Sequence, residues 1–256
     1  MRTAILTFEQ FHGKKSIGSS RIRGHWIVKH WQEAGADIGS CELFKHGGDY
    51  DAVIYQKAYF VEHARMFKGI KILDLCDPDW LFWGYKLKEM IEEVDAITTS
   101  SLEIAKFIAG MTDKPIAFIP DRIDLKALPA KKEHTSKVTK VAWYGYAENF
   151  PILDSAAPLI KKLGLELIVI SNSVYSAPSG IQGLQITNLP WTEEHYLNDI
   201  MKADIVINPR FHKGKWKYKS NNKTTLSWAL GLPVAHDQGE LNKLLLLSTK
   251  RITKSI

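Results

Sequence analysis

Three adjoining segments decide the fold of this chain: Ile205-Val206-Ile207-Asn208-Pro209, a basic loop from Arg210 to Lys219, and Ser220-Asn221-Asn222-Lys223-Thr224-Thr225-Leu226, which runs on to Gly231-Leu232-Pro233-Val234-Ala235. The β-branched run predicts a buried strand, and the side chains of Ser220 to Asn222 supply cap groups for a helix. Gly231 is placed to end that helix and Pro233 to open another strand. The whole stretch therefore has the strand, loop, helix, strand order of a parallel α/β sheet.

The start of the predicted helix suits an anion. Its free backbone N–H groups and its dipole make a positive end, and Lys223 adds a full charge in the first turn. The stretch from Arg210 to Lys223 carries six cationic side chains and no acid, interleaved with aromatic residues. We expect a phosphate or diphosphate here. The alternative is an ordinary capped helix beside a solvated basic loop.

Composition sets wider limits. With 256 residues, of which 45% are hydrophobic, the chain is long enough for two folded domains. A net charge of +6 favours phosphate-rich partners without deciding between nucleotide, nucleic acid and membrane surface. Cys41 and Cys76 fall in expected strands and predict buried, reduced thiols. No signal peptide or membrane-spanning run is visible, so we expect a cytoplasmic protein; the oligomeric state is left open.

Predicted strands and helices alternate along both halves of the sequence, which indicates doubly wound parallel sheets. The polar stretch 126–140 is the expected linker between an N-terminal domain, residues 1–125, and a C-terminal domain, residues 141–256. Pro158 is expected to kink a helix over 151–163 or to mark its true start. Strands are predicted at 3–8, 36–43, 51–55, 71–76, 96–99 and 116–119, and then at 141–144, 165–170, 184–188 and 205–207.

Two further groups of polar residues follow predicted strands of the first half. Asp77 and Asp79 come directly after strand 71–76, where α/β folds place ligands, and either carboxylate is a candidate general base; a turn without function is the alternative. The stretch from Gln10 to His30 has five cations, three histidines and no acid. It is a second candidate anion site, unless Ser19 or Ser20 only caps the following helix. Its candidate acceptor-binding residues are His12, Ser19, Arg21 and Arg23.

Taken together, these motifs resemble the GT-B glycosyltransferases that use nucleotide-sugar donors, with families 1 and 4 the most similar. Lys223 opening a helix that ends in Ala229-Leu230-Gly231-Leu232-Pro233-Val234 is the most specific match. Asp204 to Pro209 and Val94 to Ser101 also look like that family. The resemblance implies two Rossmann-like domains facing a cleft, with the donor nucleotide on the C-terminal domain.

The sequence departs from the family pattern at three places. Leu226 stands where many members carry a glutamate that holds the donor ribose. Gly145 to Phe150 lacks the arginine and lysine that clamp the diphosphate. The long C-terminal helices have no counterpart beyond Leu244 to Leu247. The expected donor site is therefore assembled from Arg210, Lys219 and Lys223 with the backbone of Ser220 to Thr224, from Asn221 or Asn222 for the ribose, and from Gly145, Tyr146 and Trp191 at the ends of predicted strands.

The resemblance implies transfer of a hexose or pentose from a nucleotide-diphosphate sugar, which is a substrate, with no cofactor. Lys223 and Arg210 would stabilise the departing diphosphate. An inverting enzyme would use Asp77, Asp79, His12 or His25 as the base, whereas a retaining enzyme could use the donor phosphate itself, and the sequence leaves the stereochemistry open. No metal-ligand spacing is visible, so transfer without a metal ion is expected. The basic loops suggest DNA with a hydroxymethylated base as acceptor. A saccharide or lipid-linked glycan is the alternative acceptor, and a non-catalytic nucleotide- or nucleic-acid-binding module is the alternative class.

Overall fold

The computed structural model describes residues 1–13, 17–38, 50–134 and 137–252. Lys14, Lys15 and Cys41, which the sequence analysis considers, lie outside these residues. The chain divides into two compact units, the first formed by Met1–Arg122 with Lys213–Asn222 and the second by Ile123–His212 with Lys223–Ile256. No helix in the described part of the chain has the length and apolar character needed to cross a membrane.

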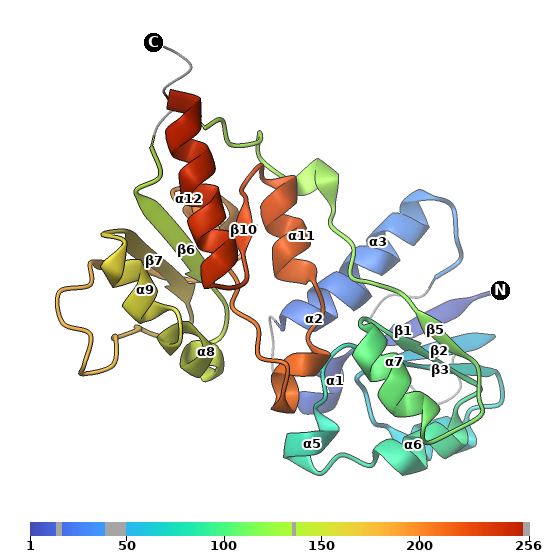
Figure 1. The fold of residues 1–256 in the computed structure, drawn as a ribbon. Coiled ribbons are helices and arrows are strands. Elements are labelled where there is room, and N and C mark those ends of the chain that lie inside the picture. The colour runs from blue at the N-terminus through green and yellow to red at the C-terminus, as the bar shows by residue number, and fades with distance from the viewer. Residues whose placement is uncertain (14–16, 39–49, 135–136, 253–256) are drawn as a thin grey trace. The chain divides into compact units, whose positions relative to one another are not determined.

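The first unit is built on a parallel sheet in which five strands follow one another in sequence order. Its strands and the helices between them carry the blue to green colours of the first half of the chain in Figure 1. A further bridge pairs Thr3 with Ile38 on the other side of the first strand. The chain therefore leaves that strand toward one edge and returns to the other, which makes a doubly wound sheet with its switch point beside the first strand. The strands are β1 (Thr3–Leu6), β2 (Ala52–Gln56), β3 (Ile70–Leu75), β4 (Ala96–Thr99) and β5 (Ile116–Phe118). Of the predicted strand 36–43, residues 39–43 lie outside the described part.

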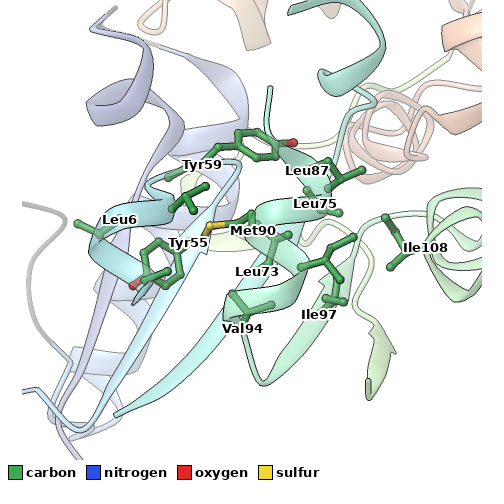
Figure 2. Close-up of a cluster of buried hydrophobic side chains, with 14 of the residues drawn as sticks. Leu6, Tyr55, Tyr59, Leu73, Leu75, Leu87, Met90, Val94, Ile97 and Ile108 are labelled. Atoms are coloured by element: carbon green, nitrogen blue, oxygen red, sulfur yellow. The ribbon is translucent and has the colours of Figure 1, made fainter. Parts of the chain in front are cut away.

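Helices cover this sheet through a large apolar cluster and a smaller one that contains Ile5, Val28 and Ile38. Met90 packs with Leu73, Leu75 and Ile97 in the large cluster, and all four side chains are fully buried (Figure 2). Ser101 caps the helix Leu102–Ala109, because its hydroxyl accepts a hydrogen bond from the Ile104 N–H at 3.3 Å. The helices are α1 (Phe8–His12), α2 (Gly18–Ser20), the π-helical turn η1 (Arg21–His25), α3 (Trp26–Glu33), α4 (Val61–Met66), α5 (Trp80–Trp83), α6 (Leu87–Glu93) and α7 (Leu102–Ala109).

The second unit has its own five-stranded parallel sheet, in the order β10-β9-β6-β7-β8. The first of these strands along the chain lies in the middle, so the sheet is again doubly wound, with its switch point between β6 and β9. Buried apolar clusters lie on both faces of the sheet. The strands are β6 (Lys140–Tyr144), β7 (Glu166–Ser171), β8 (Ile186–Pro190), β9 (Ile205–Ile207) and β10 (Val234–Ala235). The predicted α/β class with two doubly wound parallel sheets is confirmed.

Helix boundaries in the second unit follow local chemistry. Pro158 occupies the first turn of a new helix, so the predicted break at this proline is confirmed. Gly231, with φ of 82°, ends the helix that begins at Asn222, because few other residues adopt a left-handed conformation at so low a cost. The sequence pattern does not predict the last helix. The helices are α8 (Phe150–Asp154), α9 (Ala157–Lys162), α10 (Tyr196–Ile200), α11 (Asn222–Ala229) and α12 (Gln238–Ile252), with the short turns η2 (Leu125–Ala127) and η3 (Ala147–Asn149).

One segment of the sequence's second half, Lys213–Asn222, groups with the first unit. We call it the crossing segment; it contains the 3₁₀ turn η4 (Gly214–Tyr218). Tyr218 is buried in the apolar cluster of the first unit, with its ring 5.8 Å from that of Phe107. The Ser101 hydroxyl donates a 2.8 Å hydrogen bond to the Tyr218 carbonyl. Packing of one aromatic side chain thus separates this segment from the domain to which sequence order would assign it.

Candidate functional site

A buried ion cluster lies at the carboxyl ends of β2 and β3. Lys57, the residue after β2, places its Nζ 3.0 Å from Asp77 Oδ2 and 2.8 Å from Asp79 Oδ2. Lys57 is only 3% exposed, and its φ of 52° is the one positive value among the non-glycine residues described. Backbone strain of this kind costs on the order of 1–3 kcal/mol and is typical of functional sites. Lys57 was not predicted as a site residue. Its only indication in the sequence is that a charged residue directly follows an apolar strand.

The two carboxylates of this cluster have opposite electrostatic environments. Burial favours the neutral form of Asp77, but Lys219, with Nζ 2.6 Å from Oδ1, and Lys57 outweigh it and hold the pKa of Asp77 well below its usual range. For Asp79 burial dominates over the attraction of Lys57, so its pKa is raised. Asp79 is therefore the better proton acceptor, whereas Asp77 is the anchor of two ion pairs.

A buried tyrosine adjoins Asp79. The Tyr59 hydroxyl has no hydrogen-bond partner among the described residues. Burial, followed by the charge of Asp79, raises the pKa of Tyr59 well above its usual value, so the group remains a neutral hydrogen-bond donor. A buried hydroxyl without a partner needs an explanation, and a ligand hydroxyl or a water molecule would satisfy it.

A second buried ion cluster is centred on Arg23. Its Nε donates to Asp74 Oδ2 at 2.8 Å, and Nη1 donates to Asp121 Oδ1 at 2.9 Å. Burial lowers the pKa of Arg23, but Asp74 more than compensates, and the guanidinium stays charged. Ser220 donates a 2.6 Å hydrogen bond to the other oxygen of Asp121. Arg23 was predicted to bind the acceptor; its side chain is 4% exposed and is held by carboxylates, and its role toward an acceptor stays a prediction.

The other predicted acceptor residues lie close together in sequence after β1. His12 ends α1 with its ring 5.1 Å from that of Phe8, Ser19 lies within α2, and the Arg21 guanidinium lies 5.7 Å from the Trp26 ring centre. Neither Ser19 nor Ser20 caps the following helix through its side chain, so the capping alternative was wrong. Nearby, His25 Nε2 lies 3.0 Å from Glu9 Oε2; Glu9 was also missed.

In the second unit, Lys223 and Gly145 come together at the switch point of the sheet. Lys223 lies in the first turn of α11, and Gly145 directly follows β6. A Cβ atom at Gly145 would overlap the Lys223 ammonium, so glycine is required for the lysine to lie across the strand end. The ammonium lies 4.8 Å from the Trp143 ring centre, and the Tyr144 hydroxyl donates to the Lys223 carbonyl at 2.7 Å. Two residues predicted to bind the donor are thus neighbours.

A neutral hydrogen-bond network joins the same helix to the neighbouring strands. Asn208, after β9, donates from Nδ2 to Thr224 Oγ1 at 3.1 Å, and His236 Nε2 lies 2.9 Å from the same oxygen. His236 Nδ1 lies 2.9 Å from Glu240 Oε2. Asn208 and His236 are residues that the sequence analysis did not assign to the site. Leu226 is buried in the core of this unit, so the position of the family's ribose-binding glutamate is an apolar position here.

The remaining predicted donor residues are distributed between the units. Tyr146 is exposed, Trp191 stands 5.5 Å from the Tyr196 ring, and burial lowers the pKa of Arg210. Lys219 and Ser220 bind Asp77 and Asp121 of the first unit, which does not support their predicted place on the donor domain. Asn221 is exposed and Asn222 begins α11. Among the residues described, no group of three or more His, Cys, Asp or Glu side chains is arranged to hold a metal ion.

Comparison with known proteins gives the fold. No protein-family model and no curated protein matches the chain. The structure of the DNA-modifying enzyme β-glucosyltransferase, determined with and without uridine diphosphoglucose, matches 91% of this chain and 78% of that one, at TM-score 0.54 and 12% identity. The lipopolysaccharide outer core galactosyltransferase WaaB in its apo form matches 91% and 80%, at TM-score 0.56 and 11% identity. A glycosylation-associated protein of the Gap123 complex from Streptococcus agalactiae matches 72% of this chain and 41% of its own, at TM-score 0.39 and 16% identity, so this chain spans less than half of that protein. With two doubly wound parallel sheets, and with two glycosyltransferases that match over most of its length, the chain has the GT-B glycosyltransferase fold.

Proposed function

We propose that this protein is a glycosyltransferase that takes a hexose or pentose from a nucleotide-diphosphate sugar and transfers it to an acceptor hydroxyl. The observation that carries the proposal is Lys223 lying over Gly145 at the switch point between β6 and β9. Ligands of open α/β sheets bind at the carboxyl ends of the strands, at this point. Membership of families 1 and 4 stays a prediction.

The chemistry asked of the site is stabilisation of a departing diphosphate. The ammonium of Lys223 and the free N–H groups at the start of α11 supply preorganised positive charge, and Arg210 adds a second cation from the segment after β9. Removing one such group commonly lowers the rate by about 10² to 10³-fold. We propose that transfer needs no metal ion, because these cations can replace it at the diphosphate. Unchanged turnover in the presence of EDTA is the expected result.

For the acceptor side, we propose Asp79 as the general base. Its raised pKa leaves it a better proton acceptor than Asp77, which is tied to two lysines. Because base catalysis requires the ionised carboxylate, turnover is expected to fall as the pH drops below the pKa of Asp79. Asp79→Asn should lose turnover while nucleotide binding is kept.

The acceptor proposed is DNA with a hydroxymethylated base. Supporting it are the acid-free basic stretches 10–30 and 210–223 and the fold shared with a DNA-modifying glucosyltransferase. The fold shared with a lipopolysaccharide galactosyltransferase favours a saccharide acceptor instead. Transfer of labelled sugar to hydroxymethylated DNA, compared with transfer to oligosaccharides, separates the two. A rate on DNA that does not respond to salt would count against the DNA acceptor.

The donor site is tested by thermal unfolding with UDP, GDP, CDP, TDP and ADP and their sugar conjugates. Binding to the native state raises the melting temperature by mass action, and one nucleotide is expected to stand out. Lys223→Ala should abolish that shift, while the exposed Lys161→Ala in α9 should keep it. Slow donor hydrolysis without acceptor would separate an enzyme from a binding module. No stabilisation by any nucleotide would refute the donor site.

A further inference from the structure

An apolar surface is exposed on the short helix α5. Leu81 is 47% exposed and Phe82 is 55% exposed, although both follow Trp80, whose ring stacks 5.5 Å from that of Phe107. Adjoining exposed apolar side chains are one mark of an interaction site, although a single exposed side chain is common on protein surfaces. The helix belongs wholly to the first unit.

Lys215 of the crossing segment lies beside this surface, and two further lysines of the segment are close to it in sequence. Lys215 Nζ lies 5.7 Å from the Phe82 ring centre and 5.4 Å from that of Trp216. Lys213 and Lys217 stand two residues away on either side. Among the described residues, no carboxylate lies within 4.0 Å of any of these three ammonium groups. Lys219 differs, because it is paired with Asp77.

The backbone that carries these lysines is anchored to the core of the first unit. Tyr218 is buried in the core of the first unit and its carbonyl accepts the Ser101 hydroxyl at 2.8 Å. Glu103 pairs with Lys106 at 2.8 Å, and this hydrogen bond is the main cause of its lowered pKa, with Lys217 as the smallest contribution. Lys213, Lys215 and Lys217 therefore project from an anchored turn, and a ligand would not have to order the backbone before binding.

We propose that Leu81, Phe82, Lys213, Lys215 and Lys217 form a binding surface for an unpaired nucleic-acid strand, with a base stacked on Phe82 and phosphates held by the lysines. We call it the aromatic–basic patch. Alternating cations and an exposed ring are what single-strand binding surfaces use, since every base offers a π-face and every nucleotide a phosphate. The inference rests on the proposed function, because it names the surface that would bind a DNA acceptor. A binding measurement tests it without any measurement of sugar transfer.

The chemistry of the patch favours nucleic acid over a membrane. The helix α5 has four residues, too few for an amphipathic helix that lies in a lipid interface. Instead, the Lys215 ammonium lies over one face of the Phe82 ring, so a positive charge and an aromatic ring are neighbours. This combination suits one nucleotide, which has a base to stack on a ring and a phosphate to pair with an ammonium group.

The test is fluorescence anisotropy of the full chain with a labelled oligothymidine of about 16 nucleotides, the upper end of known site sizes. Dissociation constants are measured between about 50 and 200 mM salt. Lys215→Gln/Lys217→Gln should reduce the salt slope by about 1.4, which is about 0.7 for each lost phosphate contact. The matched control Lys161→Gln/Lys162→Gln removes the same charge from exposed positions of α9 and should leave the slope unchanged.

A second pair of variants tests stacking. Phe82→Ala should weaken binding about 5-fold or more at every salt concentration, with the slope kept, and Phe82→Leu should bind as weakly as the alanine variant because it lacks a ring face. Since Phe82 is largely exposed, both variants should keep the wild-type melting temperature. Equal effects of the two lysine pairs would overturn the proposal, as would wild-type affinity of Phe82→Leu. Binding to phosphatidylserine vesicles but not to the oligonucleotide would also overturn it. None of these results depends on Lys223, so the nucleotide-stabilisation test of the proposed function stands apart.

Discussion

Both sheets are parallel and doubly wound, but the side chains at their carboxyl edges differ. At the first edge, Lys57, Asp77, Asp79 and Lys219 neutralise one another in the interior. At the second edge, the Lys223 ammonium lies 4.8 Å from the Trp143 ring centre, and the Lys223 carbonyl accepts a hydrogen bond from the Tyr144 hydroxyl. The fold provides the place for a site in both units, and the side chains decide what each place can do.

This difference predicts what mutation will damage at each edge. A buried charge whose partner is removed is strongly destabilising, whereas a partly exposed lysine at a helix start can be removed at a lower cost in stability. Variants of the first edge should therefore be seen first in the free energy of unfolding. Variants of the second edge that touch only Lys223 should be seen in ligand binding.

The largest effect is expected from Lys57→Met. Removing this ammonium leaves Asp79 buried without its cation and should lower the free energy of unfolding by about 3–5 kcal/mol. Urea denaturation followed by circular dichroism measures it. Lys86→Met is the matched control, because its ion pair with Glu89 is exposed and should matter by less than about 1 kcal/mol. Equal losses in both variants would mean that the first edge is not a buried ion cluster in solution.

Leu226→Glu tests the second unit with a residue that the glycosyltransferase family often has there. Because Leu226 is buried among apolar side chains, the carboxylate should cost about 3 kcal/mol of stability instead of restoring a ribose contact. Thermal unfolding with and without nucleotide reports both quantities. A stable variant with tighter nucleotide binding would contradict this expectation and place residue 226 at the ligand.

Asp77→Asn sharpens the electrostatics of the first edge. The variant should lose about 2 kcal/mol at neutral pH, because hydrogen bonds to charged groups are removed. The pKa of Asp77 is lower in the folded chain than the unfolded value of about 3.9, so its contribution is present above that pH and is lost as the pH falls below it. The difference between wild type and variant should therefore shrink below about pH 4 in denaturation series. A difference that is constant from pH 7 to about pH 3 would contradict the depressed pKa.

The smallest effect is expected from Thr224→Val. This change removes the hydroxyl that joins Asn208 and His236 and should cost about 1 kcal/mol. Thr225→Val is the control, because the side chain of this neighbouring threonine is exposed. If the two variants unfold alike, the network at the second edge adds no measurable stability.

The sequence by itself determined the local order of the chain. Apolar runs rich in β-branched residues predicted the strands, and Pro158 predicted a helix break. The helix Asn222–Ala229 was predicted from its cap residues and from the glycine that ends it. These features depend on neighbours within one or two turns, which is the range over which a sequence pattern carries information.

Tertiary structure alone decided which of these elements share a site. Lys219 and Asp77 are separated by 142 residues in sequence, and no local pattern indicates that they form an ion pair. Lys57 becomes a buried charged residue only because β2 and β3 pair side by side. Tyr218 holds the crossing segment on the first unit, because its ring is buried in the apolar cluster of that unit. Burial of a large aromatic ring is strongly favourable and does not depend on how far apart the packed residues are in sequence. Burial and charge pairing are set by distance in space, and so they were settled only when the chain folded.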